Sequence, residues 1–303
     1  MAKLPNFLIV GAAKAGTTSL YFYLKKHPEI CLPDKIKETF FFTGKDFKDV
    51  NSEGGNYGKH AITNLEEYLD LFKNCKHAKA IGEICVAYLF FYRESIRNIK
   101  KILGEKVKII IILRNPIDRA FSNYLHHVRD GFEKETFEKA LSLENERKRK
   151  KWWWGYYLTE VGFYYNQVKA YLENFSEVKV YLYDDLKKDP LSLVQDIYRF
   201  LEVDDSFIPK SIGEKFNVSG VPKNKFLHEF LTKPNTIKSA IKPLVKLILP
   251  KETRQRFLNK LLQKNFQKPE MKPETREYLK RLYREDILKL QDLIDKDLSH
   301  WLE

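Results

Sequence analysis

Residues 5–20 read Pro5-Asn6-Phe7-Leu8-Ile9-Val10-Gly11-Ala12-Ala13-Lys14-Ala15-Gly16-Thr17-Thr18-Ser19-Leu20, an apolar run that breaks into small residues and then into a helical pattern. The pattern predicts a buried strand, a loop and a helix N-terminus. Gly11 and Gly16 are spaced as in a phosphate-binding loop, where successive backbone N–H groups converge on an anion. The stretch therefore predicts a site for a phosphate ester.

This loop departs from the pattern of nucleoside triphosphatases. In that pattern a lysine directly follows the second glycine, whereas here Thr17 follows it and the only lysine, Lys14, lies inside the loop. The ligand predicted is thus a phosphate ester other than a Mg-bound triphosphate. A glycine turn that carries a solvated lysine is the alternative.

A second motif follows the aliphatic run Lys108–Leu113, which is typical of a central parallel strand buried on both faces. The run ends in Arg114, at the sheet edge where ligands bind in such folds, and the guanidinium fork suits a phosphate. Pro116 suits the first turn of a helix, on which Ser122 can share a face with Arg114. The two motifs together predict a nucleotide with phosphates at both ends of its ribose.

The order of the remaining elements predicts an α/β fold with a P-loop-like parallel sheet flanked by helices. Strands and helices alternate through residue 203, and amphipathic basic helices follow a late loop. We expect a single domain over residues 1–303, with an α/β core at 1–203 and a helical C-terminal extension at 204–303. The predicted strands are Phe7–Val10, Ala80–Glu83, Lys108–Leu113 and Val178–Tyr183. The predicted helices are Thr17–Lys26, Glu66–Lys73, Glu94–Leu103, Pro116–Arg129, Phe137–Arg149, Gly162–Asn174, Pro190–Leu201, Thr236–Ile248, Lys251–Lys264 and Pro273–Lys296.

Composition bounds the class of protein. The net charge of +13 favours anionic partners, and 43% hydrophobic residues indicate a folded chain. No apolar stretch reaches the length of a membrane span, and the first strand begins too near Met1 for a leader. Cys31, Cys75 and Cys85 form no pairwise framework, so we expect a reducing cytosol, a cytoplasmic protein and no metal site.

The two phosphate motifs resemble those of the sulfotransferases that use 3′-phosphoadenosine 5′-phosphosulfate (PAPS). The resemblance is strongest to bacterial sulfotransferases and to heparan sulfate N- and O-sulfotransferase domains, and it covers about the first two hundred residues. Further motifs that carry it are Lys37–Phe42, Ser122–His126 and Leu182–Leu186 with Asp189-Pro190, and more weakly Asn217–Lys223. The ordered set is far more specific than one glycine loop.

The resemblance implies roles for the donor-binding residues. Arg114 and Ser122 would bind the 3′-phosphate of PAPS, and Tyr183 would lie near the adenine or that phosphate unless it is only a half-buried strand aromatic. Lys223 would close over the 3′-phosphate from the late loop. The 5′-phosphate would be held by the backbone and hydroxyls of Ala15, Gly16, Thr17 and Thr18, and Lys14 would stabilise the bridging oxygen.

The resemblance also implies the reaction, which is sulfuryl transfer to a hydroxyl or amine of a small-molecule or carbohydrate acceptor, with adenosine 3′,5′-bisphosphate as product and without a metal. Glu38 would be the general base, unless it is a surface glutamate paired with Lys35 or Lys37. His126 would assist at the sulfuryl group, whereas His127 would cap or pack. Ile84 stands where relatives that sulfate glucosamine hydroxyls carry a lysine, so this position does not support a heparan-type acceptor.

Two features leave alternatives open. The aromatic run Trp152–Tyr157 follows the cations of Arg147–Lys151 and could either stack on an acceptor ring or pack in the core. Two other functions also fit parts of the chain. A P-loop kinase or nucleoside triphosphatase would prefer ATP with Mg, and a basic nucleic-acid-binding module would show salt-dependent binding without preference for the bisphosphate.

Overall fold

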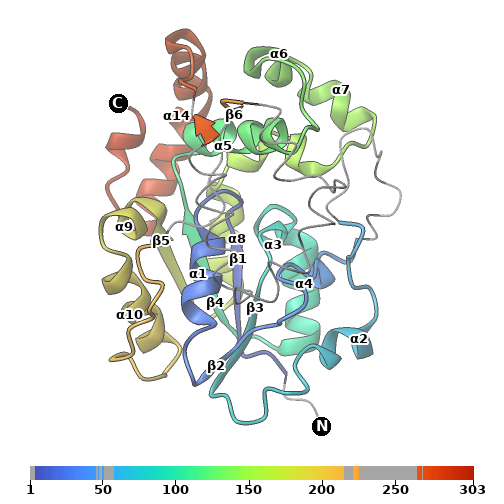
Figure 1. Ribbon diagram of the computed structural model, residues 1–303, viewed down its shortest axis with the longest axis vertical. Helices are drawn as coiled ribbons and strands as arrows, with labels where there is room; N and C mark the ends of the chain where they lie inside the picture. Colours follow the sequence, from blue (N-terminus) through green and yellow to red (C-terminus); the bar gives the residue numbers. More distant parts are fainter. Residues whose placement is uncertain are drawn as a thin grey trace, which may run out of the picture.

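The computed structural model describes residues 4–45, 47, 50, 58–214, 221–224, 265–267 and 269–303. Its centre is a parallel sheet of five strands in the order β2-β3-β1-β4-β5 (Figure 1). These strands are β1 (Phe7–Gly11), β2 (Ile30–Cys31), β3 (Ala80–Ile84), β4 (Lys108–Leu113) and β5 (Val178–Leu182). A separate antiparallel pair joins β6 (Val221–Pro222) to β7 (Phe266–Gln267). The P-loop-like α/β fold predicted from the sequence is confirmed.

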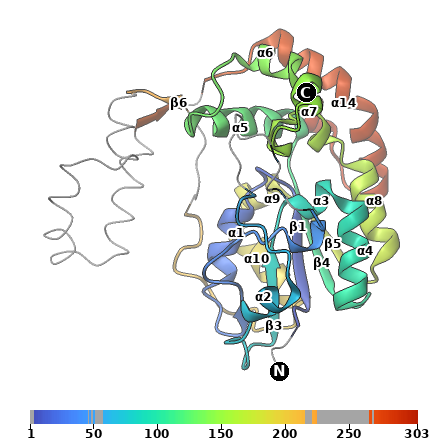
Figure 2. The ribbon, with the colours of Figure 1, turned by 90° about the vertical axis from the view of Figure 1, so that its right-hand side faces the viewer.

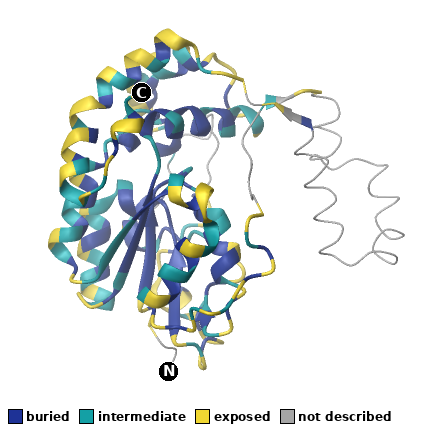
Figure 3. Ribbon diagram, turned by 90° about the vertical axis from the view of Figure 1, so that its left-hand side faces the viewer, coloured by how far each residue is buried: buried dark blue, intermediate teal, exposed yellow. Residues whose placement is uncertain are grey.

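Helices cover both faces of the sheet, as Figure 2 shows. One face carries α1 (Thr17–Leu24), α9 (Tyr183–Lys188) and α10 (Pro190–Phe200); the other carries α3 (Ala87–Phe90), α4 (Tyr92–Leu103) and α8 (Tyr165–Asn174). Every residue of β1 and β3 is buried, as is β4 after Lys108 (Figure 3). A strand shielded on both sides can be apolar throughout, which accounts for the uninterrupted aliphatic runs.

The remaining helices surround the carboxyl ends of the strands or the periphery. Helix α5 (Pro116–Arg129) crosses above the end of the sheet in Figure 2, with α6 (Phe137–Ser142) and α7 (Glu144–Arg149) beyond it. Helix α14 (Pro273–Ile294) packs on α5 and α8, and α2 (Leu65–Asp70) precedes β3. Short 3-10 turns occupy Phe41–Thr43, Trp154–Tyr156, Glu160–Gly162 and Ser299–Trp301.

The start of α5 follows from local chemistry. The Asn115 side chain accepts the Ile117 N–H at 3.0 Å, and Pro116 occupies the first turn, where a missing N–H costs nothing. The helix therefore runs from Pro116 to Arg129, as predicted. This fixed start places Ser122 and His126 on successive turns above the sheet.

Several predicted elements differ from the structure. Helix Phe137–Arg149 is two helices that meet at Leu143, and Val178–Tyr183 ends one residue earlier, because Tyr183 begins α9. Strand β2 and helix α3 were not predicted, because two and four residues are too short for a periodic signal. Predicted helices Thr236–Ile248 and Lys251–Lys264 lie outside the described residues.

The expectation of unpaired cysteines is wrong for two of the three. Cys31 and Cys75 form a disulfide with their Cα atoms 5.7 Å apart, and only Cys85 is a free, buried thiol. Parallel pairing of Cys31 with Ile81 brings the end of β2 beside the chain that enters β3. A separation of 44 residues hides this proximity from the sequence. The predicted cytosolic location therefore loses the support of the cysteine count.

Candidate active site

A cavity of about 880 Å³ opens at the carboxyl ends of the strands. Its walls are supplied by the loop after β1, the segment after β2, helix α5, the 3-10 turn Trp154–Tyr156 with the residue before it, and the start of α9. Lining residues include the predicted site residues Lys14, Gly16, Thr17, Thr18, Glu38, Arg114, Ser122, His126 and Tyr183. Side chains from positions 14 to 183 of the chain thus meet in one place.

The loop after β1 makes a tight turn at Gly16 before the first helix. Gly16 has φ +89°, and a Cβ there would lie 2.7 Å from Cδ2 of Leu186, so glycine is required both for its backbone and for its size. The loop passes directly into α1, whose first turn holds Thr17 and Thr18. Ala15 is fully buried in this loop, so its contribution is limited to the backbone.

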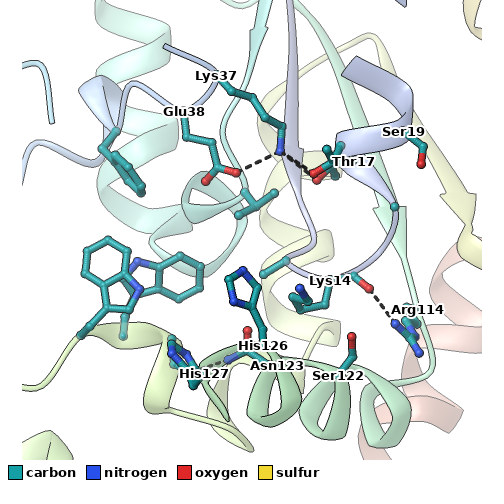
Figure 4. Close-up of a pocket in the computed structure, with 18 of the residues that line it drawn as sticks. Lys14, Thr17, Ser19, Lys37, Glu38, Arg114, Ser122, Asn123, His126 and His127 are labelled. Carbon is teal, nitrogen blue, oxygen red and sulfur yellow. Dashed lines mark hydrogen bonds and ion pairs between the residues drawn. The ribbon is translucent and has the colours of Figure 1, made fainter. Parts of the chain in front are cut away.

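Arg114 closes the loop from the neighbouring strand. Its Nη1 donates a 3.0 Å hydrogen bond to the carbonyl oxygen of Lys14, and its guanidinium carbon lies 5.0 Å from the centroid of the Tyr183 ring. Figure 4 shows Arg114 and Ser122 at the same end of the cavity, with Lys14 between them and His126. The structure thereby places the two predicted phosphate motifs beside each other.

Lys37 is a site residue that the sequence analysis missed. Its ammonium lies 3.3 Å from Oγ1 of Thr18, 3.5 Å from Oγ1 of Thr17 and 3.1 Å from Oε1 of Glu38 (Figure 4). Its place beside Glu38 in the phenylalanine-rich motif was the available signal. One cation therefore connects the phosphate loop to the predicted base, and the pairing of Glu38 with Lys37 occurs inside the cavity.

The segment that carries Glu38 is anchored to the sheet by a buried carboxylate. Glu83, with no exposed surface, accepts hydrogen bonds from Thr39 Oγ1 at 2.6 Å, Tyr88 Oη at 2.8 Å and Tyr68 Oη at 2.9 Å. Burial raises the pKa of Glu83 to about 7, although the three hydroxyl donors act to lower it. Thr39 in turn accepts the Phe41 N–H, so the residues around Glu38 are held in place.

The electrostatics of the cavity are dominated by cations. Burial lowers the pKa of Lys14 well below its usual value, and the nearby charges of Arg129 and Arg114 lower it further. Because burial disfavours the charged form of Lys14, an anion bound at the loop would stabilise that charged form. This is the environment expected for a lysine that meets a phosphate or sulfate.

Both histidines of α5 lie at the cavity. His126 lines the cavity, with its Nδ1 3.0 Å from Oδ2 of Asp130, and burial lowers its pKa. His127 was expected to cap or pack; it stacks on Tyr156 with centroids 4.2 Å apart, but it also lines the cavity. Burial lowers the pKa of His127 to about 3, so this imidazole is neutral near pH 7.

The aromatic run divides between the two alternatives. Trp153 and Trp154 line the cavity, whereas Trp152 does not and instead lies 4.8 Å from the guanidinium carbon of Arg147. Arg147 itself forms a buried ion pair with Glu133 at 2.6 Å. Lys223, the predicted clamp on the 3′-phosphate, is exposed after β6 and is not among the lining residues.

A turn near the C-terminus lies behind the end of the cavity that carries Arg114 and Tyr183. The indole N–H of buried Trp301 donates to Oδ2 of Asp184 at 3.1 Å, and Asn115 Nδ2 donates to the Trp301 carbonyl at 3.1 Å. Asn115 and Asp184 directly follow Arg114 and Tyr183. Trp301 therefore joins the two strand ends that present these side chains.

Two features are absent from residues 4–45, 47, 50, 58–214, 221–224, 265–267 and 269–303. Within those ranges, no group of three or more His, Cys, Asp or Glu side chains could hold a metal ion. No described helix combines the length and the apolar character needed to cross a bilayer.

Comparisons with known proteins agree with the geometry. Residues 4–292 match the model of the sulfotransferase domain. The chain is 27% identical over 209 residues to the mouse bifunctional heparan sulfate N-deacetylase/N-sulfotransferase 4, covering 66% of this chain and 22% of that protein. It is 32% identical over 156 residues to mouse carbohydrate sulfotransferase 15, covering 41% of this chain and 27% of that protein. The chain thus spans about a quarter of the length of these curated relatives.

A solved structure covers nearly the whole chain. The crystal structure of a sulfotransferase from Alicyclobacillus acidocaldarius aligns with a TM-score of 0.77 and 33% identity, over 99% of this chain and 100% of that one. The likeness therefore extends from the β1 loop to α14.

Proposed function

Because the chain belongs to the sulfotransferase family, we propose that it transfers a sulfuryl group from PAPS to a hydroxyl or amine by in-line displacement. The observation that carries the proposal is the convergence of two phosphate motifs and a carboxylate on one cavity. A nucleotide with a 3′-phosphate and a 5′-phosphosulfate would occupy both phosphate motifs, whereas the phosphates of a nucleoside triphosphate would occupy only one of them.

The donor site is argued from the chemistry of its side chains. Arg114 offers a guanidinium fork and Ser122 a hydroxyl, which together suit the 3′-phosphate. Lys37, Thr17 and Thr18 gather at the mouth of the β1 loop, where the 5′-phosphate would be held by backbone N–H groups as well. Tyr183 offers an aromatic face beside Arg114 for the adenine or the ribose.

The transfer step requires charge stabilisation and a base. The S–O bond to the bridging oxygen breaks while a new S–O bond forms to the acceptor, so negative charge grows on the leaving phosphate. The ammonium group of Lys14 stabilises that charge. In the protein without a bound anion, burial makes the charged form of this lysine unfavourable. Glu38 accepts the proton of the attacking hydroxyl or amine, and the Lys37 ammonium lies 3.1 Å from this carboxylate.

Donor specificity provides the test. Calorimetric titration should give tight binding of adenosine 3′,5′-bisphosphate and weak binding of ATP with Mg²⁺. Added EDTA should not weaken the binding of the bisphosphate. Transfer is then measured with ³⁵S-labelled PAPS against a library of metabolites and glycans, with mass spectrometry for the added SO₃. Preference for ATP would favour the kinase alternative, and strong salt-dependent DNA or RNA binding without nucleotide preference would favour the nucleic-acid module.

A further inference from the structure

One buried carboxyl group behind the cavity has no part in the transfer step. Glu83 lies on β3 without exposed surface, and its partners are the hydroxyl groups of Thr39, Tyr68 and Tyr88. Building on the proposed function, we propose that Glu83 is a neutral carboxylic acid in the working enzyme and that its proton positions the segment that carries Glu38. Glu83 is thus a positioning residue, which acts through Thr39 and not on the substrates.

The hydrogen bonds of this cluster need more hydrogens than its hydroxyl groups supply. Four oxygen–oxygen contacts join the side chains: Thr39 to Glu83 at 2.6 Å, Tyr88 to Glu83 at 2.8 Å, Tyr68 to Glu83 at 2.9 Å, and Thr39 to Tyr88 at 2.8 Å. Each contact has the length of a hydrogen bond and requires a hydrogen between its two oxygens. The three hydroxyl groups carry one hydrogen each. The acid proton of Glu83 supplies the fourth.

An ionised Glu83 would leave one contact without a hydrogen. If all three hydroxyl groups donated to the carboxylate, the oxygens of Thr39 and Tyr88 would face each other at 2.8 Å with only lone pairs between them. A hydrogen shared between two acceptors would be bent away from both, which weakens both bonds. With a proton on Oε1, Glu83 donates to Tyr88, Tyr88 to Thr39, and Thr39 back to Oε2 of Glu83. The three residues then form a closed ring, and Tyr68 still donates to Oε1.

A second buried carboxylate has no such shortage. Glu144 accepts from the backbone N–H of Thr159 at 2.8 Å, from the Thr159 hydroxyl at 2.9 Å and from the N–H of Glu160 at 3.0 Å. These three contacts have three hydrogens, so Glu144 needs no proton of its own. Glu144 is 6% exposed and Glu83 is 0% exposed, so the two carboxyl groups form a matched pair that differs in the count of hydrogens.

The surroundings of Glu83 also favour its acid form. Burial raises the pKa of Glu83 to about 7, and the charge of Glu38 adds to the rise, whereas the three hydroxyl donors act to lower it. The other titratable groups that face Glu83 are the phenols of Tyr68 and Tyr88 and the thiol of Cys85. Burial raises the pKa of each of these well above its usual value, so they are neutral near pH 7 and offer no counter-charge.

The two carboxyl groups of this region differ in their cations. The Lys37 ammonium lies 3.1 Å from Glu38, whereas no lysine, arginine or histidine of the described ranges forms an ion pair with Glu83. An ionised Glu83 would therefore be an uncompensated buried charge beside the proposed base. The cluster thereby divides two roles between two carboxyl groups, because the buried one holds a proton and the one in the cavity accepts one.

The ring holds the backbone that follows Glu38. The Thr39 hydroxyl accepts the Phe41 N–H at 3.2 Å, and the Tyr88 hydroxyl accepts the Phe42 N–H at 3.4 Å. Within the ring each of these hydroxyl oxygens donates one hydrogen bond and accepts two, so the cluster is fully satisfied. Loss of the acid proton removes one bond of the ring and loosens the chain next to the base.

Infrared difference spectroscopy tests the proton directly and needs no substrate. A neutral carboxylic acid has a C=O stretch that an ionised carboxylate lacks. The spectrum of the wild type minus that of Glu83→Gln should contain this band at pH 5.5 and lose it at pH 9, and the band should shift in D₂O. The spectrum of the wild type minus that of Glu144→Gln should lack the band at pH 5.5.

Turnover with labelled PAPS tests the positioning role, with 2-naphthol as the acceptor, or chitobiose if the phenol is not accepted. Glutamine resembles the neutral acid, because its oxygen can accept from both tyrosines while its N–H donates to Thr39. We expect Glu83→Gln to keep kcat within about twofold of the wild type at pH 6, and Glu83→Leu to lower it about tenfold or more. The KM for PAPS should change little in either variant.

The pH dependence separates positioning from packing. The ratio of kcat for Glu83→Gln to kcat for the wild type should rise by about three- to tenfold between pH 6 and 8.5, because ionisation removes one hydrogen bond from the wild-type ring and glutamine cannot ionise. Groups that titrate in both proteins, such as Lys14, cancel in this ratio. The control Glu144→Gln should lose stability in urea while its kcat ratio stays constant with pH.

Three results would overturn the inference. They are a difference spectrum without the acid band, a Glu83→Gln variant that loses as much turnover as Glu83→Leu, and a kcat ratio that stays constant between pH 6 and 8.5. Titration with adenosine 3′,5′-bisphosphate checks the fold of each variant, and Thr39→Val replaces Glu83→Leu if that variant does not fold. A wild type that does not bind the bisphosphate would contradict the proposed function, whereas the infrared band decides the protonation of Glu83 by itself.

Discussion

The hydroxyl of Thr39 donates a 2.6 Å hydrogen bond to Glu83, which joins the residue next to the predicted base to the end of a central strand. A buried carboxylate is costly unless several donors satisfy it, and Glu83 has three. The desolvation of Glu83 therefore coincides with the anchoring of Thr39, the residue next to Glu38.

This carboxylate should leave a signature in the pH dependence of stability. The folded-state pKa of Glu83 is raised to about 7, so the native state binds more protons than the unfolded state between about pH 4.5 and 7. The unfolding free energy should therefore fall with rising pH in that window, by about 3 kcal/mol from this group. Glu83→Gln should remove this fall.

Urea unfolding of the wild type and Glu83→Gln at pH 5, 6, 7 and 8.5 measures the difference. The control Glu173→Gln, on the exposed surface of α8, should run parallel to the wild type. A difference between wild type and Glu83→Gln that stays constant with pH would show that Glu83 does not titrate in this range.

Recognition of the 3′-phosphate should depend on Arg114. Arg114→Ala cuts a charge-assisted contact and should weaken binding of adenosine 3′,5′-bisphosphate by about 2–5 kcal/mol. Adenosine 5′-phosphosulfate lacks the 3′-phosphate and should lose much less. Calorimetric titration of both nucleotides measures this, with Arg93→Ala on the exposed face of α4 as control. Equal losses for both nucleotides would reassign Arg114 to another part of the donor.

Donor binding should be accompanied by proton uptake at Lys14. The pKa of this lysine is lowered in the free protein by burial and by Arg129 and Arg114, and a bound anion should raise it again. The number of protons taken up should therefore increase with pH, toward about one proton, as the free amine becomes neutral. Titrations of the bisphosphate in buffers of different ionisation enthalpy give this number. Uptake that persists in Lys14→Met would assign the proton to another group.

The base prediction concerns turnover without a change in donor affinity. Glu38→Gln keeps the size of the side chain but removes its basicity, so turnover should fall by about two orders of magnitude or more. Bisphosphate affinity should change little, because the phosphate motifs are intact. Any surrogate acceptor suffices for the comparison. A glutamine variant that keeps most of its activity would make His126 the leading candidate for the base.

Trp301 should influence donor binding although it does not line the cavity. Trp301→Phe removes the indole N–H that bonds Asp184 but keeps the backbone carbonyl that accepts from Asn115. Bisphosphate affinity should fall by about two- to tenfold, the usual worth of one hydrogen bond. The control is His300→Ala, whose exposed ring lies 3.5 Å from the same carboxylate. An affinity equal to that of the wild type would limit Trp301 to packing.

Much of this architecture could be predicted because it depends on local chemistry. The aliphatic run before Arg114 is typical of a buried strand, and Asn115 with Pro116 fixes the start of α5. The β1 loop was evident from Gly11 and Gly16. The placement of Arg114 beside Tyr183 then follows from parallel strands whose carboxyl ends share one edge.

The rest depends on contacts between distant segments. The Glu83 network joins residues 39, 68, 83 and 88, and the disulfide joins Cys31 to Cys75; neither leaves a pattern along the chain. The contacts of the Lys37 ammonium with Thr17 and Thr18 could not be predicted, because they depend on the direction taken by its long, flexible side chain. Lys223 was predicted from the weak motif Asn217–Lys223, of which residues 217–220 lie outside the described residues.

The two ends of the cavity are carried by different parts of the chain, which has a consequence for protein engineering. The proposed donor-binding groups come from the ends of β1, β4 and β5 and from α5, whereas Phe40, Trp153 and Trp154 line the cavity from two connecting segments, around Phe40 and around Trp153–Gly155. Exchanging these two segments with those of a related chain should therefore change which alcohol or amine is sulfated while the nucleotide affinity is kept. Specificity in this scaffold can then be varied by loop grafting, without redesign of the sheet.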